Sequence, residues 1–214
     1  MENSVSRKAV NYHVHHQRAD SRFVEHWYVP VAFYGNSSQH TAMSDKEIII
    51  KTSRLQLREF VLEDAAFLLS LMNSPGYVRY IGDRNLRCTA DAQDYIAERI
   101  APPYQQDGYG MWLVQEAIDA KPVGTCGLVN REFMDDVDLG YAFLPEASGL
   151  GYATEAAAAV LDYASRNLGF DRVVAITALE NPGSIRVLEK LGYRFSRIIS
   201  FPGDDEGARL FEPT

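Results

Sequence analysis

One short stretch, Pro145-Glu-Ala-Ser-Gly-Leu-Gly-Tyr-Ala-Thr-Glu155, constrains the fold more than any other part of this chain. It follows a predicted strand at Val137–Leu144 and opens a predicted helix at Tyr152–Leu168. Gly149 and Gly151 let the backbone approach a ligand closely, and the free N–H groups at a helix start interact favourably with negative charge. The stretch therefore predicts a phosphate-binding loop. A tight strand-to-helix turn without a ligand is the alternative.

The glycine spacing disfavours two well-known nucleotide-binding motifs. A dinucleotide fingerprint needs a third glycine where Thr154 stands, and it belongs in the first strand-helix-strand unit rather than late in the chain. A P-loop needs Gly-Lys-Ser or Gly-Lys-Thr, which this stretch lacks. We therefore expect neither a dinucleotide-binding fold nor a P-loop fold.

Hydrophobic periodicity and turn residues divide the chain from Glu47 onward into strands and helices. Expected strands are Ile48–Ile50, Leu55–Leu57, Met111–Glu116, Val123–Asn130, Val137–Leu144, Val173–Leu179, Tyr193–Phe201 and Arg209–Phe211. Expected helices are Leu62–Met72, stopping before Pro75; Thr89–Ile100, ended by Pro102-Pro103; Tyr152–Leu168; and one from Asn181-Pro182 to Gly192. Hairpins followed by strand-helix alternation indicate an α/β (α+β) fold, with a mixed sheet and helices on both faces.

Charge and residue types exclude several classes of function. A net charge of -8 argues against a nucleic-acid binder, which would need a basic face. The longest uncharged apolar run near the loop is Ala156–Leu161, far too short to cross a bilayer. Cys88 and Cys126 are too few for a disulfide framework and lack metal-ligand spacing, so a cytoplasmic protein without a metal is expected.

The first 42 residues differ in composition from the rest. They contain all five histidines and an aromatic patch from Phe23 to Tyr34, without the apolar region of a signal peptide. We expect 1–42 to be a poorly ordered extension and 43–214 to be the functional domain; an arm that docks its aromatic side chains is the alternative. Because no histidine follows Met43, the domain has no neutral-pH histidine base.

Two motifs in the right order resemble the GCN5-related N-acetyltransferase (GNAT) family. They are Gly149-Leu-Gly-Tyr-Ala-Thr-Glu155 and Asn181-Pro-Gly-Ser-Ile-Arg-Val-Leu-Glu-Lys-Leu-Gly-Tyr193. The opening Thr52-Ser-Arg-Leu-Gln-Leu-Arg58 is similar to the first strand of the branch that contains the ribosomal-protein N-terminal acetyltransferases. The resemblance spans about 48–211. It implies the acyl-CoA N-acyltransferase fold, with a mixed, mostly antiparallel sheet.

The resemblance also implies an acetyl-CoA site. Pantetheine would pair with the backbone at Phe143 and Leu144. Asn181 would contact the pantetheine arm; capping its own helix is the alternative, and the two roles do not exclude each other. The diphosphate would lie on N–H groups of the loop, formed by Ser148, Gly149, Leu150, Gly151, Tyr152, Ala153 and Thr154. Ser148 and Leu150 stand where relatives often carry basic or aromatic residues, so backbone N–H groups would carry most of the binding.

Catalytic residues follow from the same resemblance. Leu188 stands where many relatives carry a tyrosine proton donor, and Ser184 resembles the serine proposed as donor in this branch. Without histidine, a carboxylate acting directly or through water must take the proton of the amine. Asp138 matches the acid of the branch's strand, with Glu132 as the second candidate; both can also be simple surface charges. We expect Glu155 to complement the helix dipole.

The predicted function is transfer of the acetyl group of acetyl-CoA to a primary amine by direct attack. The two cysteines have no histidine partner after Met43, which disfavours a covalent cysteine route. The nine excess acids of 43–214 predict a cationic acceptor. A non-catalytic acyl-CoA-binding module of the same fold is the alternative. We expect a monomer or a homodimer.

Overall fold

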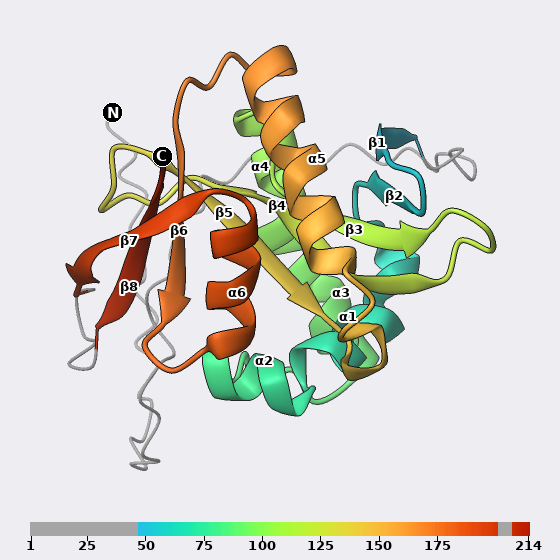
Figure 1. The fold of residues 1–214 in the computed structure, drawn as a ribbon. Helices are drawn as coiled ribbons and strands as arrows, with labels where there is room; N and C mark the ends of the chain where they lie inside the picture. Colours follow the sequence, from blue (N-terminus) through green and yellow to red (C-terminus); the bar gives the residue numbers. More distant parts are fainter. Residues whose placement is uncertain (1–46, 201–206) are drawn as a thin grey trace, which may run out of the picture.

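The computed structural model describes residues 47–200 and 207–214. Within them, eight strands form one sheet in the order β1-β2-β3-β4-β5-β6-β8-β7 (Figure 1). The strands are β1 Ile48–Lys51, β2 Leu55–Arg58, β3 Met111–Glu116, β4 Pro122–Val129, β5 Val137–Phe143, β6 Val173–Ala178, β7 Tyr193–Ile199 and β8 Ala208–Pro213. Only the β5–β6 pair is parallel among these neighbours. The predicted mixed, mostly antiparallel sheet is confirmed.

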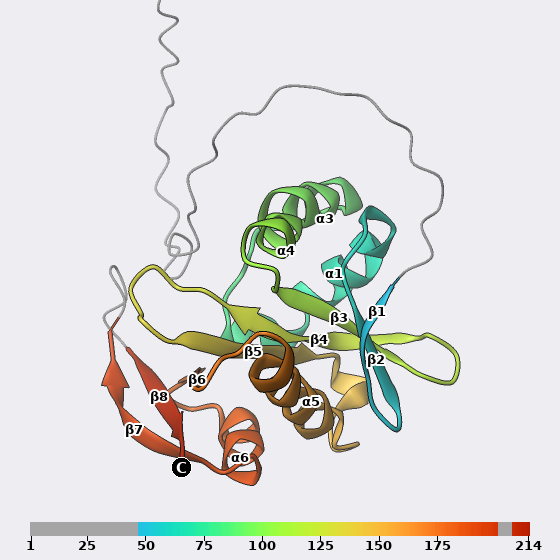
Figure 2. The same cartoon turned by 90° about the horizontal axis from the view of Figure 1, so that it is seen from above.

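Helices cover both faces of the sheet, as predicted (Figure 2). The short helical turns are η1 Leu62–Asp64, the π-helical η2 Ile96–Ile100 and η3 Pro145–Ala147, and the α-helices are α1 Ala65–Met72, α2 Pro75–Tyr80, α3 Thr89–Tyr95, α4 Ala101–Gln106, α5 Tyr152–Asn167 and α6 Pro182–Lys190. On one face α1, α3 and α4 bury a cluster around Leu68, Ile96 and Leu113. On the other, α5 buries small side chains such as Ala157 and Val160 against β4 and β5.

The expected stop before Pro75 is confirmed, because α1 ends at Met72, whereas the expected stop at Pro102-Pro103 was wrong. Pro75 also occupies the first turn of α2, a helix that was not predicted from the sequence. Pro102 and Pro103 do not end the helix from Thr89, because the chain stays helical through η2 and α4. Both cases have one cause: the first N–H groups of a helix have no partner within it, so proline is tolerated there.

Two sequence expectations lie outside the described residues. These are the poorly ordered extension at 1–42 and the end of the strand that was predicted to reach Phe201. The other expected elements match the observed ones to within a few residues at their ends. The helix α5, which follows the glycine loop, and the helix α6 both begin on the side of the sheet where β5 and β6 end.

Candidate active site

The two parallel strands at the centre of the site separate soon after they meet. β5 pairs with β6 at Val137–Val173 and Asp138–Val174, and this is the extent of the register in the described chain. The next N–H group of β6 in position to bond, that of Ile176, donates instead to Oδ1 of Asp138 at 2.9 Å. A side-chain oxygen therefore takes the place of a strand acceptor at the point where the strands diverge.

Asp138 is held in place on both of its oxygens. Its side chain is 1% exposed, and Arg131 from the β4–β5 loop donates from Nε to Oδ2 at 2.7 Å and also from Nη2. Burial raises the pKa of the Asp138 carboxyl, and Arg131 and the Ile176 N–H group offset only part of that rise. Protonation of this carboxylate would weaken its bonds to Arg131 and to the Ile176 N–H group. Glu132, the second candidate, is exposed on the same loop.

The glycine loop has the backbone conformation that its sequence requires. Gly149 and Gly151 have φ values of 79° and 81°, in the left-handed region that side-chain-bearing residues rarely adopt. Gly151 directly precedes α5, whose first backbone bond is from the Glu155 N–H group to the Gly151 carbonyl at 3.1 Å. The N–H groups before Glu155 therefore have no intrahelical acceptor and are available to an anion.

Glu155 does more than complement the helix dipole. It accepts hydrogen bonds from Thr52 Oγ1 at 2.6 Å, from the Arg54 N–H group at 3.1 Å and from Arg54 Nε at 2.7 Å. Arg54 Nη1 then donates to the Leu150 carbonyl at 2.9 Å, so the β1–β2 turn holds the glycine loop. Burial alone would raise the pKa of Glu155, but the bonds from Thr52 and Arg54 outweigh it and the net pKa is lowered.

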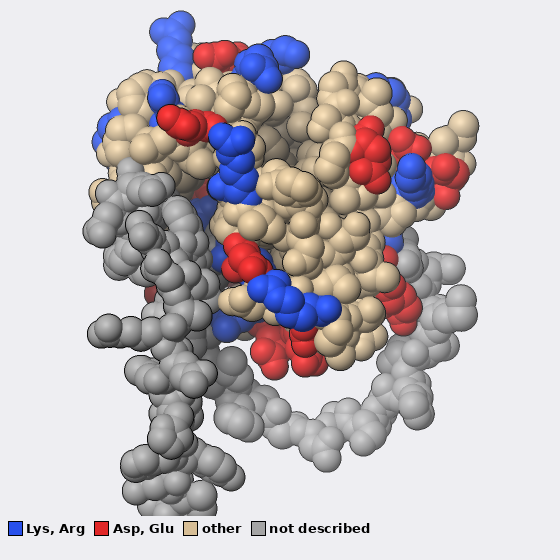
Figure 3. Space-filling model, turned by 90° about the horizontal axis from the view of Figure 1, so that it is seen from below, with Lys and Arg blue, Asp and Glu red and all other residues tan. Residues whose placement is uncertain are grey.

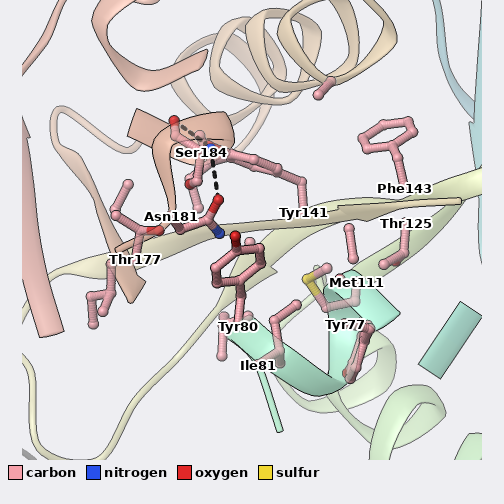
Figure 4. A pocket seen from close by; sticks show the side chains of 18 of the residues that line it. Tyr77, Tyr80, Ile81, Met111, Thr125, Tyr141, Phe143, Thr177, Asn181 and Ser184 are labelled. Carbon is pink, nitrogen blue, oxygen red and sulfur yellow. Dashed lines mark hydrogen bonds between the residues drawn. The ribbon is translucent and has the colours of Figure 1, made fainter. Parts of the chain in front are cut away.

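On the opposite side of the cleft, α6 begins with a cap and a hydroxyl pair (Figure 4). Asn181 Oδ1 accepts from the Ser184 N–H group at 3.1 Å, so the capping alternative for Asn181 is confirmed. Ser184 Oγ lies 2.8 Å from the hydroxyl oxygen of Tyr141 on β5. Tyr141 was not among the predicted site residues, because its partner lies 43 positions further along the chain. Leu188 is completely buried in the core.

These parts line one cavity of about 2090 Å³. Ten predicted site residues contribute to its lining, namely Asp138, Phe143, Ser148, Gly149, Gly151, Tyr152, Ala153, Thr154, Asn181 and Ser184. The other three, Glu132, Leu144 and Leu150, lie outside that lining. Tyr77, Tyr80 and Ile81, in and after the unpredicted α2, line it opposite β5 (Figure 4). The loop, the strand gap and the hydroxyl pair thus share one space.

The charges around the cavity differ from the net charge of the chain. Among the described lining residues, six are basic (Arg79, Arg84, Arg99, Arg131, Arg186 and Lys190) and three are acidic (Glu98, Asp138 and Glu180). In the view of Figure 3, acidic and basic side chains are interspersed around a larger uncharged area. The lining therefore lacks the acid excess that a cationic acceptor would favour.

Three further observations concern residue types. No helix in 47–200 or 207–214 is long and apolar enough to cross a membrane. The same residues contain no group of three potential metal ligands among His, Cys, Asp and Glu. Cys126 is buried, and burial raises the pKa of its thiol, whereas Cys88 is exposed. Neither cysteine is among the residues that line the cavity.

Comparisons with known proteins agree with this geometry. Residues 54–194 match the family model described as "Acetyltransferase (GNAT) domain". Two Bacillus subtilis (strain 168) relatives are the uncharacterised protein YkkB, 31% identical over 69% of this chain and 86% of its own, and the uncharacterised N-acetyltransferase YnaD, 39% identical over 68% and 82%. A solved structure of RimL, a ribosomal L7/L12 alpha-N-protein acetyltransferase in complex with CoA, has a TM-score of 0.65 at 15% identity over 78% of this chain and 97% of its own. The chain belongs to the GNAT acetyltransferase family.

Proposed function

We propose that the protein transfers the acetyl group of acetyl-CoA to a primary amine by direct attack. The observation that carries the proposal is the single cavity that joins the left-handed glycine loop, the gap between β5 and β6, and the Tyr141–Ser184 hydroxyl pair. The glycine loop offers an anion site for the diphosphate of CoA, and the open edge of β5 offers backbone groups to the pantetheine arm. The hydroxyl pair offers a hydrogen-bond donor to the departing thiolate.

The residues present fit CoA as the donor. The N–H groups from Gly149 to Ala153 would hold the diphosphate, and the free backbone edge of β5 near Phe143 would pair with pantetheine. The Asn181 side-chain oxygen caps α6, and its Nδ2 group would remain as a donor to the pantetheine arm. The fixed position of the loop, held by Arg54 and Glu155, reduces the ordering that binding would otherwise require.

The attacking amine must be neutral, and the domain has no histidine to accept its proton. We propose that water at the cavity mouth takes this proton. The excess of basic side chains in the lining favours the neutral amine, because like charges nearby disfavour the ammonium form. Direct proton transfer to Asp138 or Glu132 stays a prediction, and for Asp138 it conflicts with the bonds to Arg131 and Ile176.

A non-catalytic acyl-CoA-binding module is the second candidate. The observation that favours it is Leu188, which is buried where many relatives carry the proton donor. Both candidates predict CoA binding, and only the first predicts turnover. We expect a cytoplasmic monomer or homodimer in either case.

The experiment that tests the proposal measures release of free CoA from acetyl-CoA. The acceptors are an N-terminal peptide amine, a polyamine, an antibiotic amine and a free amino acid, and a Cys88→Ser background removes the exposed protein thiol that would react with the thiol reagent. Turnover that requires an amine supports the enzyme. CoA binding without release for any amine class would favour the non-catalytic module, and absence of CoA binding would reject both.

A further inference from the structure

Three hydrogen-bond contacts hold Tyr141 and Ser184 in place (Figure 4). The Tyr141 hydroxyl oxygen lies 2.8 Å from Ser184 Oγ and 3.2 Å from the Ser184 carbonyl oxygen. The Ser184 N–H group is held at 3.1 Å by the Asn181 cap. The serine side chain therefore sits at the start of α6 with its hydroxyl against the phenol, inside the proposed cofactor cavity.

We propose that Tyr141 is a positioning residue for acyl transfer: its hydroxyl donates to Ser184 Oγ and thereby directs the hydrogen bond of the serine O–H group to the sulfur of CoA. The inference rests on the proposed function, and it assigns a role to a residue on β5 that neither the loop nor the α6 motif contains. Ser184 is the group that touches the reacting atoms, and Tyr141 acts through it.

The hydrogen bonds of the pair permit two arrangements. In the first, Ser184 Oγ donates to the Tyr141 oxygen at 2.8 Å, and Tyr141 donates to the Ser184 carbonyl at 3.2 Å. In the second, Tyr141 donates to Ser184 Oγ, and the single serine proton becomes available to another acceptor. A thiolate in the cleft favours the second arrangement, because hydrogen bonds to charged acceptors are stronger than those between neutral groups.

The environment of Tyr141 keeps its proton on the phenol. Burial raises the pKa of Tyr141, the hydrogen bond with Ser184 lowers it in part, and the negative charge of Asp138 raises it further. Tyr141 therefore keeps its proton at neutral pH and can supply a hydrogen bond to Ser184 Oγ. A chain of two hydroxyl groups that ends on an anion strengthens each bond in it.

The atoms and electrons of the step balance without an additional reactant. The amine nitrogen forms a bond to the acetyl carbon, and the bond between that carbon and sulfur breaks. The electron pair of the broken bond stays on sulfur as a thiolate, which accepts the Ser184 hydrogen bond and is protonated by solvent on release. The proton lost by the amine goes to water.

The first test needs no acceptor amine. The ultraviolet absorbance of the thiolate is titrated for CoA bound to the Cys88→Ser protein, with S-methyl-CoA as the blank. We expect the thiol pKa of bound CoA to lie below its ordinary value of about 8.5. Tyr141→Phe and Ser184→Ala should each reduce the thiolate equilibrium about tenfold, which is about one pH unit.

Tyr193→Phe is the matched control. The Tyr193 hydroxyl donates to the Val173 carbonyl at 2.7 Å, and Tyr193 is buried but lies outside the cavity lining. The Tyr193→Phe variant should destabilise the fold without changing the thiol pKa of bound CoA. If CoA binds but its thiol pKa is the same in wild type, Tyr141→Phe and Ser184→Ala, the inference is overturned. If CoA does not bind at all, the proposed function fails instead.

The second test uses any amine that supports turnover. Tyr141→Phe should lower kcat about tenfold with little change in the acetyl-CoA KM, because the hydroxyl pair acts on the leaving thiolate. In a Ser184→Ala background the same change should have almost no further effect. Multiplicative losses in the double variant would show that Tyr141 acts independently of Ser184 and would overturn the assignment.

Discussion

Replacing Asp138 with asparagine distinguishes a carboxylate that holds the cleft open from one that accepts a proton. Asparagine keeps an oxygen that can accept from the Ile176 N–H group, so the divergence of β5 and β6 should survive. Its amide group would face Arg131, however, which bonds to Asp138 through Nε and Nη2. The change therefore removes the negative charge and leaves a guanidinium opposite another donor.

The size of the effect follows from the burial of the pair. Arg131 and Asp138 have 15% and 1% of their side chains exposed. Removing one partner of a buried ion pair costs about 3–5 kcal/mol, and the partial exposure of Arg131 places the expected loss near the lower limit, about 3 kcal/mol. For a chain of this size, that loss lowers the melting temperature by roughly 6–12 °C.

Denaturant and thermal unfolding measure this loss, and calorimetry with CoA measures the cleft. Asp136→Asn is the matched control, because Asp136 stands two residues before Asp138 and also pairs with an arginine, Arg172. The side chains of this pair are 37–47% exposed, so its loss should cost about 0–1 kcal/mol of stability. Asp138→Asn should lose stability while retaining most of its CoA affinity. An Asp138→Asn protein with wild-type stability and almost no kcat would refute this reasoning and establish Asp138 as the base.

Two further predictions concern the glycine loop. Glu155 has a lowered pKa, so its stabilisation is complete above its unfolded value of about 4.5 and is lost as pH falls through its folded value. Glu155→Gln should therefore lower stability at neutral pH and flatten the loss of stability below about pH 4.5 in acid unfolding curves; an unchanged acid limb would contradict the role of Glu155. Gly151→Ala should cost about 1–2 kcal/mol from its φ of 81°, since the nearest atom to the new methyl group, Arg54 Nη2, is at 3.5 Å. It should also weaken CoA binding in calorimetry, whereas Gly169→Ala, with a φ of 73° and open space at the other end of α5, should cost similar stability with unchanged affinity.

The sequence predicted best what is encoded by neighbouring residues. The β3–β4 hairpin, the helix α5 and the Asn181 cap all follow from periodicity or local hydrogen bonding, which act within a few residues. The helix α2 was missed for a related reason. Pro75 was interpreted as a stop for α1, but the same missing N–H group makes it suitable for the first turn of the next helix.

The contacts that organise the site could not be predicted in this way. Arg54 meets Glu155 across 101 residues, Tyr141 meets Ser184 across 43, and Asp138 meets Ile176 across 38. Each pair forms only when the sheet order is in place, and a single sequence gives no pairing signal for it. Arg54 lies within the Thr52–Arg58 motif that resembles the first strand of the family, yet nothing local to that motif indicates that Arg54 holds the loop before α5.

The net charge of the chain likewise does not predict the charge that an acceptor amine meets in the cavity. The net charge of -8 sums side chains over the whole surface, and charges beyond about 8 Å are largely screened at physiological ionic strength. An amine in the cavity instead responds to its described lining, where six basic side chains face three acidic ones. The acidic surface can therefore raise the encounter rate of a cation without holding it. In the amine screen, a preference for polyamines due to steering should appear in kcat/KM and disappear as salt is raised. A preference that persists at high salt would have to come from Glu98, Asp138 or Glu180, and it would show that the arginines of the lining do not face the acceptor.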